Sequence, residues 1–206
     1  MVFSQPKLNL VLGTGYYNPK IETTDPIPKI GFVGKNLLLN WGMRYQIYPN
    51  VRIGYSQSHS LHFGSIGSSN YRRNISYRSI SFETFYLMKE KIELNFSLAP
   101  MLNKGSITIS AKAPTNDWDS FLSAYGNSSV SLETGSSMTK RWVGFSSHMG
   151  CRYYFSRLIS VEGQLGYFMS SYSDKNWKLE GEKNLNGPPM KIGRLPVLQI
   201  NLVVGI

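Results

Sequence analysis

Apolar and polar residues alternate with a period of two along most of the chain. The alternation returns in eight segments, at residues 8–16, 37–47, 51–55, 80–86, 92–98, 143–155, 159–169 and 198–206. Successive side chains of a β-strand point to opposite faces, so this period predicts strands with one apolar and one polar face. The chain is therefore predicted to be all-β, with eight strands.

The connections between these segments fall into two length classes. Three are tight turns, at Tyr48–Asn50, Met88–Lys91 and Ser156–Arg157. Four are long, at about residues 18–35, 59–74, 103–138 and 170–194. A transmembrane barrel has short periplasmic turns and long outer loops, whereas a soluble sandwich has no reason to sort its connections in this way. We predict a single domain over residues 1–206, an antiparallel up-and-down transmembrane β-barrel with both chain ends on the short-turn side.

Composition separates this barrel from its soluble alternative. Only 17% of residues are charged, and the polar face of the segments is mostly Gly, Ser, Asn and Gln. A face in contact with water would carry many Lys and Glu. Tyr and Phe residues near the strand ends are typical of an interfacial aromatic girdle. The pattern favours a membrane barrel over a soluble lipocalin-like barrel, whose apolar face would point inward.

The sequence contains neither a helix-length apolar run nor an intact signal peptide. No run of about 20 apolar residues exists, so no transmembrane helix is expected. Residues 1–5 are too short for a signal peptide and are interpreted as a residual stub.

The last nine residues, Leu198–Ile206, alternate apolar and polar side chains up to the C-terminus. This segment resembles the terminal assembly strand of the small eight-stranded outer-membrane β-barrels of Gram-negative bacteria. Porin-like, OmpW-like and OmpX-like barrels all fit the pattern. The chain departs from it in ending on Ile206, where an aromatic residue is usual. The resemblance implies an outer-membrane location with the long loops outside and the termini in the periplasm.

Charged residues within the strands are few and fall mostly on the polar face. The strands carry Lys7, Arg44, Arg52, Arg78, Arg152, Glu83, Glu93 and Glu162. Five of these lie close to a tight turn and are predicted to converge in the periplasmic half of the lumen, namely Arg44, Arg152, Glu83, Glu93 and Glu162. Because an unpaired buried charge is costly, we expect them to pair. They would form either a plug that blocks flow or a gate whose pairs can be exchanged.

The net charge of +10 arises from 22 basic and 12 acidic residues. Basic pairs lie near the outer strand ends, at Arg72-Arg73 and Lys140-Arg141. In an outer membrane these side chains would meet lipopolysaccharide phosphates, which Arg and Lys bind through charge-assisted hydrogen bonds. Nucleic acid is not expected as a partner, because no helical basic stripe, zinc site or aromatic RNA-binding motif is present.

The third long connection contains a helical pattern. Trp118, Phe121, Leu122 and Tyr125 fall on one helical face. Thr115 or Asn116 can cap the start of this helix and Gly126 can end it. The predicted helix either caps the barrel mouth or offers a docking surface to a protein or lipid partner.

A catalytic role is a further alternative, because some eight-stranded barrels resemble lipid A acyltransferases or deacylases. His59 and His62, with Asp119-Ser120, could form a His–Ser–Asp set. Their order and spacing do not match those families, so no catalytic residues are assigned. His148 is expected in the lumen, and Cys151 on the lipid face as a small apolar residue. We find no metal cluster, phosphate-binding loop or dinucleotide motif, and expect no cofactor.

The sequence thus predicts a non-catalytic structural, adhesion or envelope-complex subunit that presents basic extracellular loops. A small-solute pore is the first alternative, and a lipid A-modifying enzyme is the second.

Overall fold

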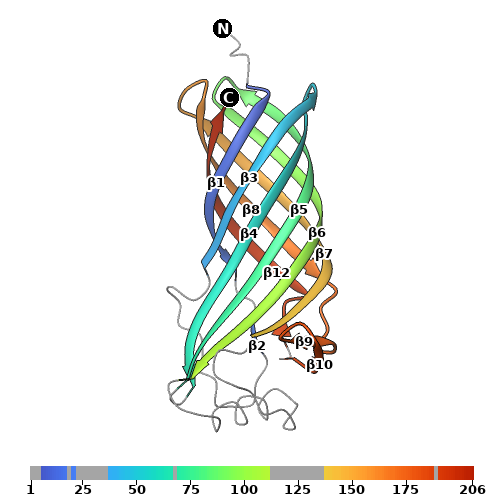
Figure 1. Ribbon diagram of the computed structural model, residues 1–206. Helices are drawn as coiled ribbons and strands as arrows, with labels where there is room; N and C mark the ends of the chain where they lie inside the picture. The colour runs from blue at the N-terminus through green and yellow to red at the C-terminus, as the bar shows by residue number, and fades with distance from the viewer. Residues whose placement is uncertain (1–5, 18–19, 22–36, 67–68, 112–136, 188–189) are drawn as a thin grey trace.

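The computed structural model is an elongated β-barrel (Figure 1). It describes residues 6–17, 20–21, 37–66, 69–111, 137–187 and 190–206. The start of β1 and the C-terminus lie at the end where the short turns are, here named the turn end; the opposite end, with the long connections, is named the loop end. No helix in the described part of the chain is long and apolar enough to cross a membrane.

Eight long strands build the barrel wall. Their bounds are β1 Leu8–Tyr17, β3 Leu37–Tyr48, β4 Val51–Ile66, β5 Ser69–Lys89, β6 Ile92–Ala111, β7 Ser137–Tyr154, β8 Ile159–Ser170 and β12 Arg194–Gly205. Four short strands lie at the loop end: β2 Lys20–Ile21, β9 Trp177–Leu179, β10 Lys183–Leu185 and β11 Met190–Lys191.

The wall is closed by antiparallel pairing of each long strand with two neighbours. Strand β1 pairs with β3 and β12, the meander continues from β3 to β8, and β8 pairs with β12. Closure leaves no free edge along the common length of the strands, which removes the unpaired backbone groups that a lipid environment cannot satisfy. The predicted all-β, eight-stranded, up-and-down barrel is confirmed.

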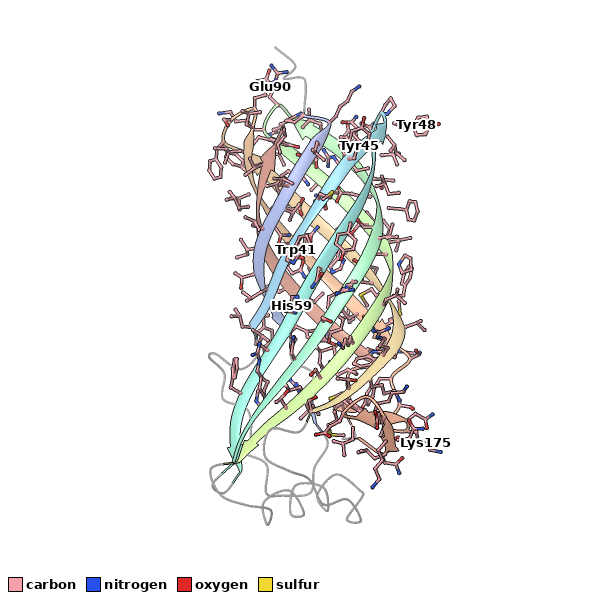
Figure 2. All side chains as sticks on the ribbon, viewed as in Figure 1. Trp41, Tyr45, Tyr48, His59, Glu90 and Lys175 are labelled. Carbon is pink, nitrogen blue, oxygen red and sulfur yellow. The ribbon has the colours of Figure 1, made fainter. Side chains whose placement is uncertain are left out.

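The apolar face of each strand points outward. Leu12, Trp41, Phe82, Met149 and Leu165 are between 43% and 67% exposed. Aromatic side chains gather at the turn end of this belt, where Tyr45 and Tyr48 are labelled near the upper rim in Figure 2. A closed barrel with such an apolar outer belt has the surface of a membrane-spanning protein.

Two of the connections predicted to be long are shorter than expected. Residues 59–74 belong largely to the β4–β5 hairpin, and β6 continues to Ala111 before the described chain resumes at β7. The prediction ended these strands where the strict apolar alternation stops. The ladder continues past that point because polar side chains on both faces do not prevent backbone pairing.

The interior differs between the two ends. The turn half is polar, with buried side chains such as Arg52, Glu162 and Asn201. The loop half holds a cluster of buried apolar residues: Tyr17, Leu38, Ile75, Tyr77, Met101, Ile107, Met138, Trp142, Phe168, Trp177, Leu179, Leu185, Met190, Ile192 and Val197. Apolar side chains therefore replace much of the polar inner face in the loop half, which the alternation of residues did not predict.

Candidate functional site

Glu162 is the centre of an ion network in the turn half. Arg44 donates two hydrogen bonds to its carboxylate, at 2.7 and 2.8 Å, from β3 on the far side of the barrel. Arg152 of β7 donates to Glu162 Oε2 from Nε at 2.9 Å and from an outer nitrogen at 2.6 Å. Asn95 and Asn201 donate to the same carboxylate at 3.0 and 3.4 Å. Glu162 therefore joins strands on both sides of the interior.

A second part of the network is organised by Arg52. Its guanidinium binds Glu93 through two hydrogen bonds of 2.7 and 2.8 Å and Glu83 through one of 2.8 Å. The guanidinium also lies 3.6 Å from the centre of the Phe85 ring. Glu83 is within 3.0 Å of Arg44 as well, which links the two parts.

All five predicted network residues are brought together, and Arg52 joins them. Three arginines face three glutamates, so the formal charges of this group cancel. In the sequence, Arg52 lies on the polar face, two residues after the tight turn Tyr48–Asn50. This position is a signal from which Arg52 could have been assigned to the ion network.

The loop half is closed by aromatic rings. Tyr17, Tyr77 and Phe168 pack against one another with centroids 4.9 to 5.5 Å apart. The His148 ring lies edge-on to Phe168 at 5.7 Å. Each ring comes from a different strand, so together they fill the cross-section of a narrow barrel.

The β9–β10 hairpin folds back toward the barrel mouth. Trp177 is fully buried, and its indole Nε1 donates to the Tyr172 hydroxyl at 3.1 Å. Lys140 of β7 donates to the Ser173 carbonyl at 2.6 Å and to the Lys175 carbonyl, which fixes the start of this connection to the wall. Partial burial raises the pKa of Tyr172, and desolvation lowers the pKa of Lys140.

The four basic residues predicted to contact lipopolysaccharide have different surroundings. Arg72 is exposed, 5.7 Å from the Phe63 ring centre, and Arg141 is also exposed. Lys140 is occupied by the carbonyls described above. Arg73 is 1% exposed and points into the barrel, so the expected headgroup contact does not hold for this side chain.

The histidines do not gather into one site. His59 faces outward on β4, where its ring nitrogens lie 2.7 Å from Gln57 Nε2 and 3.4 Å from Asn74 Oδ1 (Figure 2). His62 is buried on the opposite face of the same strand. His148 faces the interior from β7, and Cys151 is exposed on the lipid side, as predicted.

Several predictions fall on residues outside the described part of the chain. These are the loop helix with Trp118, Phe121, Leu122 and Tyr125, and the Asp119-Ser120 pair. Among the described residues, no group of His, Cys, Asp and Glu is arranged to hold a metal ion.

Sequence comparison gives no relative. No protein-family model matches the chain, and no curated protein sequence matches it.

Solved structures nevertheless share its architecture. Neisserial surface protein A has a TM-score of 0.59 at 9% identity, covering 97% of both chains. A major outer membrane protein of Thermus thermophilus has a TM-score of 0.62 at 8% identity, covering 96% of this chain and 98% of that one. The attachment invasion locus protein Ail of Yersinia pestis has a TM-score of 0.52 at 10% identity, covering 97% and 98%.

The closed wall, the outward apolar belt and these structural likenesses together define a class. The chain has the fold of the small eight-stranded outer-membrane β-barrels of Gram-negative bacteria. At these levels of identity the likeness concerns the fold, and function has to be argued from the side chains.

Proposed function

We propose that this outer-membrane barrel is a non-catalytic surface protein. It presents its loop end to anionic outer-leaflet lipid and to a protein partner, and it does not conduct solutes. The observation that carries the non-conducting part of the proposal is that both halves of the interior are filled. Paired ions span the turn half around Glu162, and packed rings span the loop half at Phe168.

The wall of the barrel is extended on one side only. Strands β4, β5, β6 and β7 have 16, 21, 20 and 18 residues, whereas β1, β3, β8 and β12 have 10 to 12. In Figure 1, β4, β5 and β6 continue well past the end of β3. A sheet that stands beyond the apolar belt adds nothing to crossing a membrane, so it favours a role in contacts outside it.

Basic side chains mark the loop-side limit of the apolar belt. Moving outward along the exposed face, Leu102 is followed by Lys104 on β6, and Val143 by Arg141 on β7. Lys104 and Arg141 are register partners on adjacent strands. Like charges directly opposite each other are unfavourable unless an anion lies between them. This height and charge suit a lipid phosphate of the outer leaflet.

Lipid binding can be tested with the double variant Lys104→Gln/Arg141→Gln. Native mass spectrometry of the detergent-solubilised barrel with bis-phosphorylated lipid A should show affinity reduced at least about tenfold, since two charge-assisted contacts are lost. Lys89→Gln/Lys91→Gln removes the same charge at the turn end and should bind as the wild type does. Equal binding by both double variants, or by dephosphorylated lipid A, contradicts the lipid contact. The lipid A itself should be chemically unchanged after incubation.

Closure can be tested in planar bilayers. The wild-type barrel should give no conductance steps, and neither Arg44→Ala nor Phe168→Ala alone should open it, because one barrier remains in each. The double variant Arg44→Ala/Phe168→Ala should conduct. Steps from the wild-type barrel would overturn the non-conducting part of the proposal.

A small pore is the second candidate, and one observation favours it. The Glu83 carboxylate lies 2.8 Å from Arg52, 3.0 Å from Arg44 and 3.8 Å from Arg152. A carboxylate within reach of three guanidinium groups could exchange partners and act as a gate. Conductance from Arg44→Ala alone would support this candidate.

A further inference from the structure

A chamber lies in the middle of the barrel, between the ion network and the aromatic rings. The volume available inside it is about 40 Å³, which is enough for about three water-sized groups. Each of the eight wall strands contributes to its lining. Six serines contribute hydroxyl groups to that lining: Ser56, Ser58, Ser79, Ser81, Ser97 and Ser146.

The charges that border the chamber are already neutralised. Arg44 and Glu83 line its floor, and both belong to the balanced set of three arginines and three glutamates. An ion entering the chamber would lose its water shell without gaining an unpaired opposite charge from this set. An uncharged guest avoids that cost.

Hydrogen-bonding capacity inside the chamber is left over. His148 Nε2 is buried and has no hydrogen-bond partner among the described residues. The Ser56 and Ser79 hydroxyls bond each other at 2.7 Å, and Ser58 donates to Asn40 Oδ1 at 3.1 Å. A hydroxyl can both donate and accept, so these groups can rotate to bind a guest as well. Burying His148 Nε2 without a partner is costly, which makes a bound polar molecule favourable.

Buried polar groups without partners are also found nearer the loop end. Beyond the chamber, the Asn103 amide and Trp142 Nε1 are buried without hydrogen-bond partners in the described part of the chain. Asn103 is the register partner of Tyr77 on one side and of Trp142 on the other. Unpartnered polar groups therefore also lie on one wall of the barrel beyond the chamber.

We propose that the serine-lined chamber is a binding site for a small, uncharged, hydroxyl-bearing molecule. The serine hydroxyls and His148 Nε2 bind its polar groups, and Phe168 covers its apolar side. This site is independent of the proposed role of the loop end, and it requires no conduction through the barrel.

Binding can be measured by NMR of the detergent-solubilised barrel, with glycerol as the probe. The side-chain signals of His148 should shift in a saturable way, whereas choline and acetate, which are small ions, should leave them unchanged. The double variant Ser97→Leu/Ser146→Leu fills the chamber and should abolish the shift. Ser147→Leu, on the lipid face of the same strand, is the matched control and should retain it. No saturable shift in the wild type, or an equal shift in the filled variant, would overturn the proposal.

A second measurement leaves the chamber unfilled. In the variant Ser146→Cys/Cys151→Ala the chamber carries the only thiol of the chain. Neutral methyl methanethiosulfonate should modify it, and glycerol should slow the reaction severalfold. Reagents of the same type that carry a sulfonate or a trimethylammonium group should react at least tenfold more slowly. Equal rates for neutral and charged reagents would refute the selectivity for uncharged guests.

Discussion

The two halves of the barrel interior are filled in opposite ways. In the turn half, Glu162 and its arginine partners exchange charge-assisted hydrogen bonds of 2.6 to 2.9 Å. In the loop half, rings such as Phe168, which is 3% exposed, fill the space by packing. Outside, the apolar belt continues from the level of the ion network to that of Phe168, whose neighbour Tyr167 is 54% exposed. The membrane therefore constrains only the outer face, and the inner face is free to take either solution.

The ion network and the packed core respond differently to substitution. A buried charge that loses its partner keeps its full desolvation cost, so the ion network tolerates removal of a single member poorly. A packed core loses contacts in proportion to the atoms removed. Substitutions in the two halves should separate these behaviours.

The largest effect is expected from Glu162→Gln. Arg44 and Arg152 would then remain buried without their shared carboxylate, with a loss of about 3 to 5 kcal/mol in the free energy of unfolding. Urea unfolding in detergent micelles, followed by tryptophan fluorescence, measures this. Glu182→Gln, at an exposed position of the loop end, should change stability by less than about 0.5 kcal/mol. A small effect of Glu162→Gln would mean that the network contributes little.

The next largest loss in the free energy of unfolding, about 3 kcal/mol, is expected from Phe168→Ala, because it leaves a cavity between Tyr17 and Tyr77. Phe168→Leu should recover part of this loss, because a packed core loses contacts in proportion to the atoms removed. The same unfolding assay applies. If the leucine variant were as unstable as the alanine variant, ring geometry rather than filled volume would govern this half.

Two asparagines offer a closer comparison. Asn201 in the turn half donates to Glu162 and accepts from Asn40, so Asn201→Leu should cost about 1 to 3 kcal/mol. Asn103 in the loop half has no hydrogen-bond partner among the described residues, and Asn103→Leu should be neutral within about 1 kcal/mol. Comparable losses at both positions would remove the distinction between the halves.

The smallest effect is expected from Lys140→Gln. The substitution shortens the side chain that donates to the Ser173 and Lys175 carbonyls, so the connection after β8 should open more often. Hydrogen exchange of amides 171–179 should become faster while that of β1 and β12 stays unchanged. Lys183→Gln, on the exposed edge of β10, is the control.

Much of the fold could be predicted because the alternation of residues reports directly on strand faces. The convergence of Arg44, Arg152, Glu83, Glu93 and Glu162 followed from their inward positions near tight turns. Their individual pairings could not be predicted. Arg44 and Glu162 are separated by 118 residues and meet only because the closed barrel brings β3 and β8 to face each other across the lumen.

The apolar loop half was missed for a physical reason. Residues there are apolar on both faces, as in Leu37-Leu38 and Tyr167-Phe168, and a period of two cannot identify which member faces lipid. The structure resolves this: Tyr167 is 54% exposed and Phe168 3%. Adjacent apolar pairs at the loop-side ends of strands were the available signal.

The sequence by itself determined the strands, their two faces and the membrane-spanning character of the barrel. These properties depend on local alternation and on turn length, which are readable along the chain. Only the tertiary structure decided how the interior is filled: which charges pair, which rings meet, and where the serine-lined chamber remains between them. Those contacts depend on register and closure, because a shift of one residue would turn every side chain of a strand to the other face.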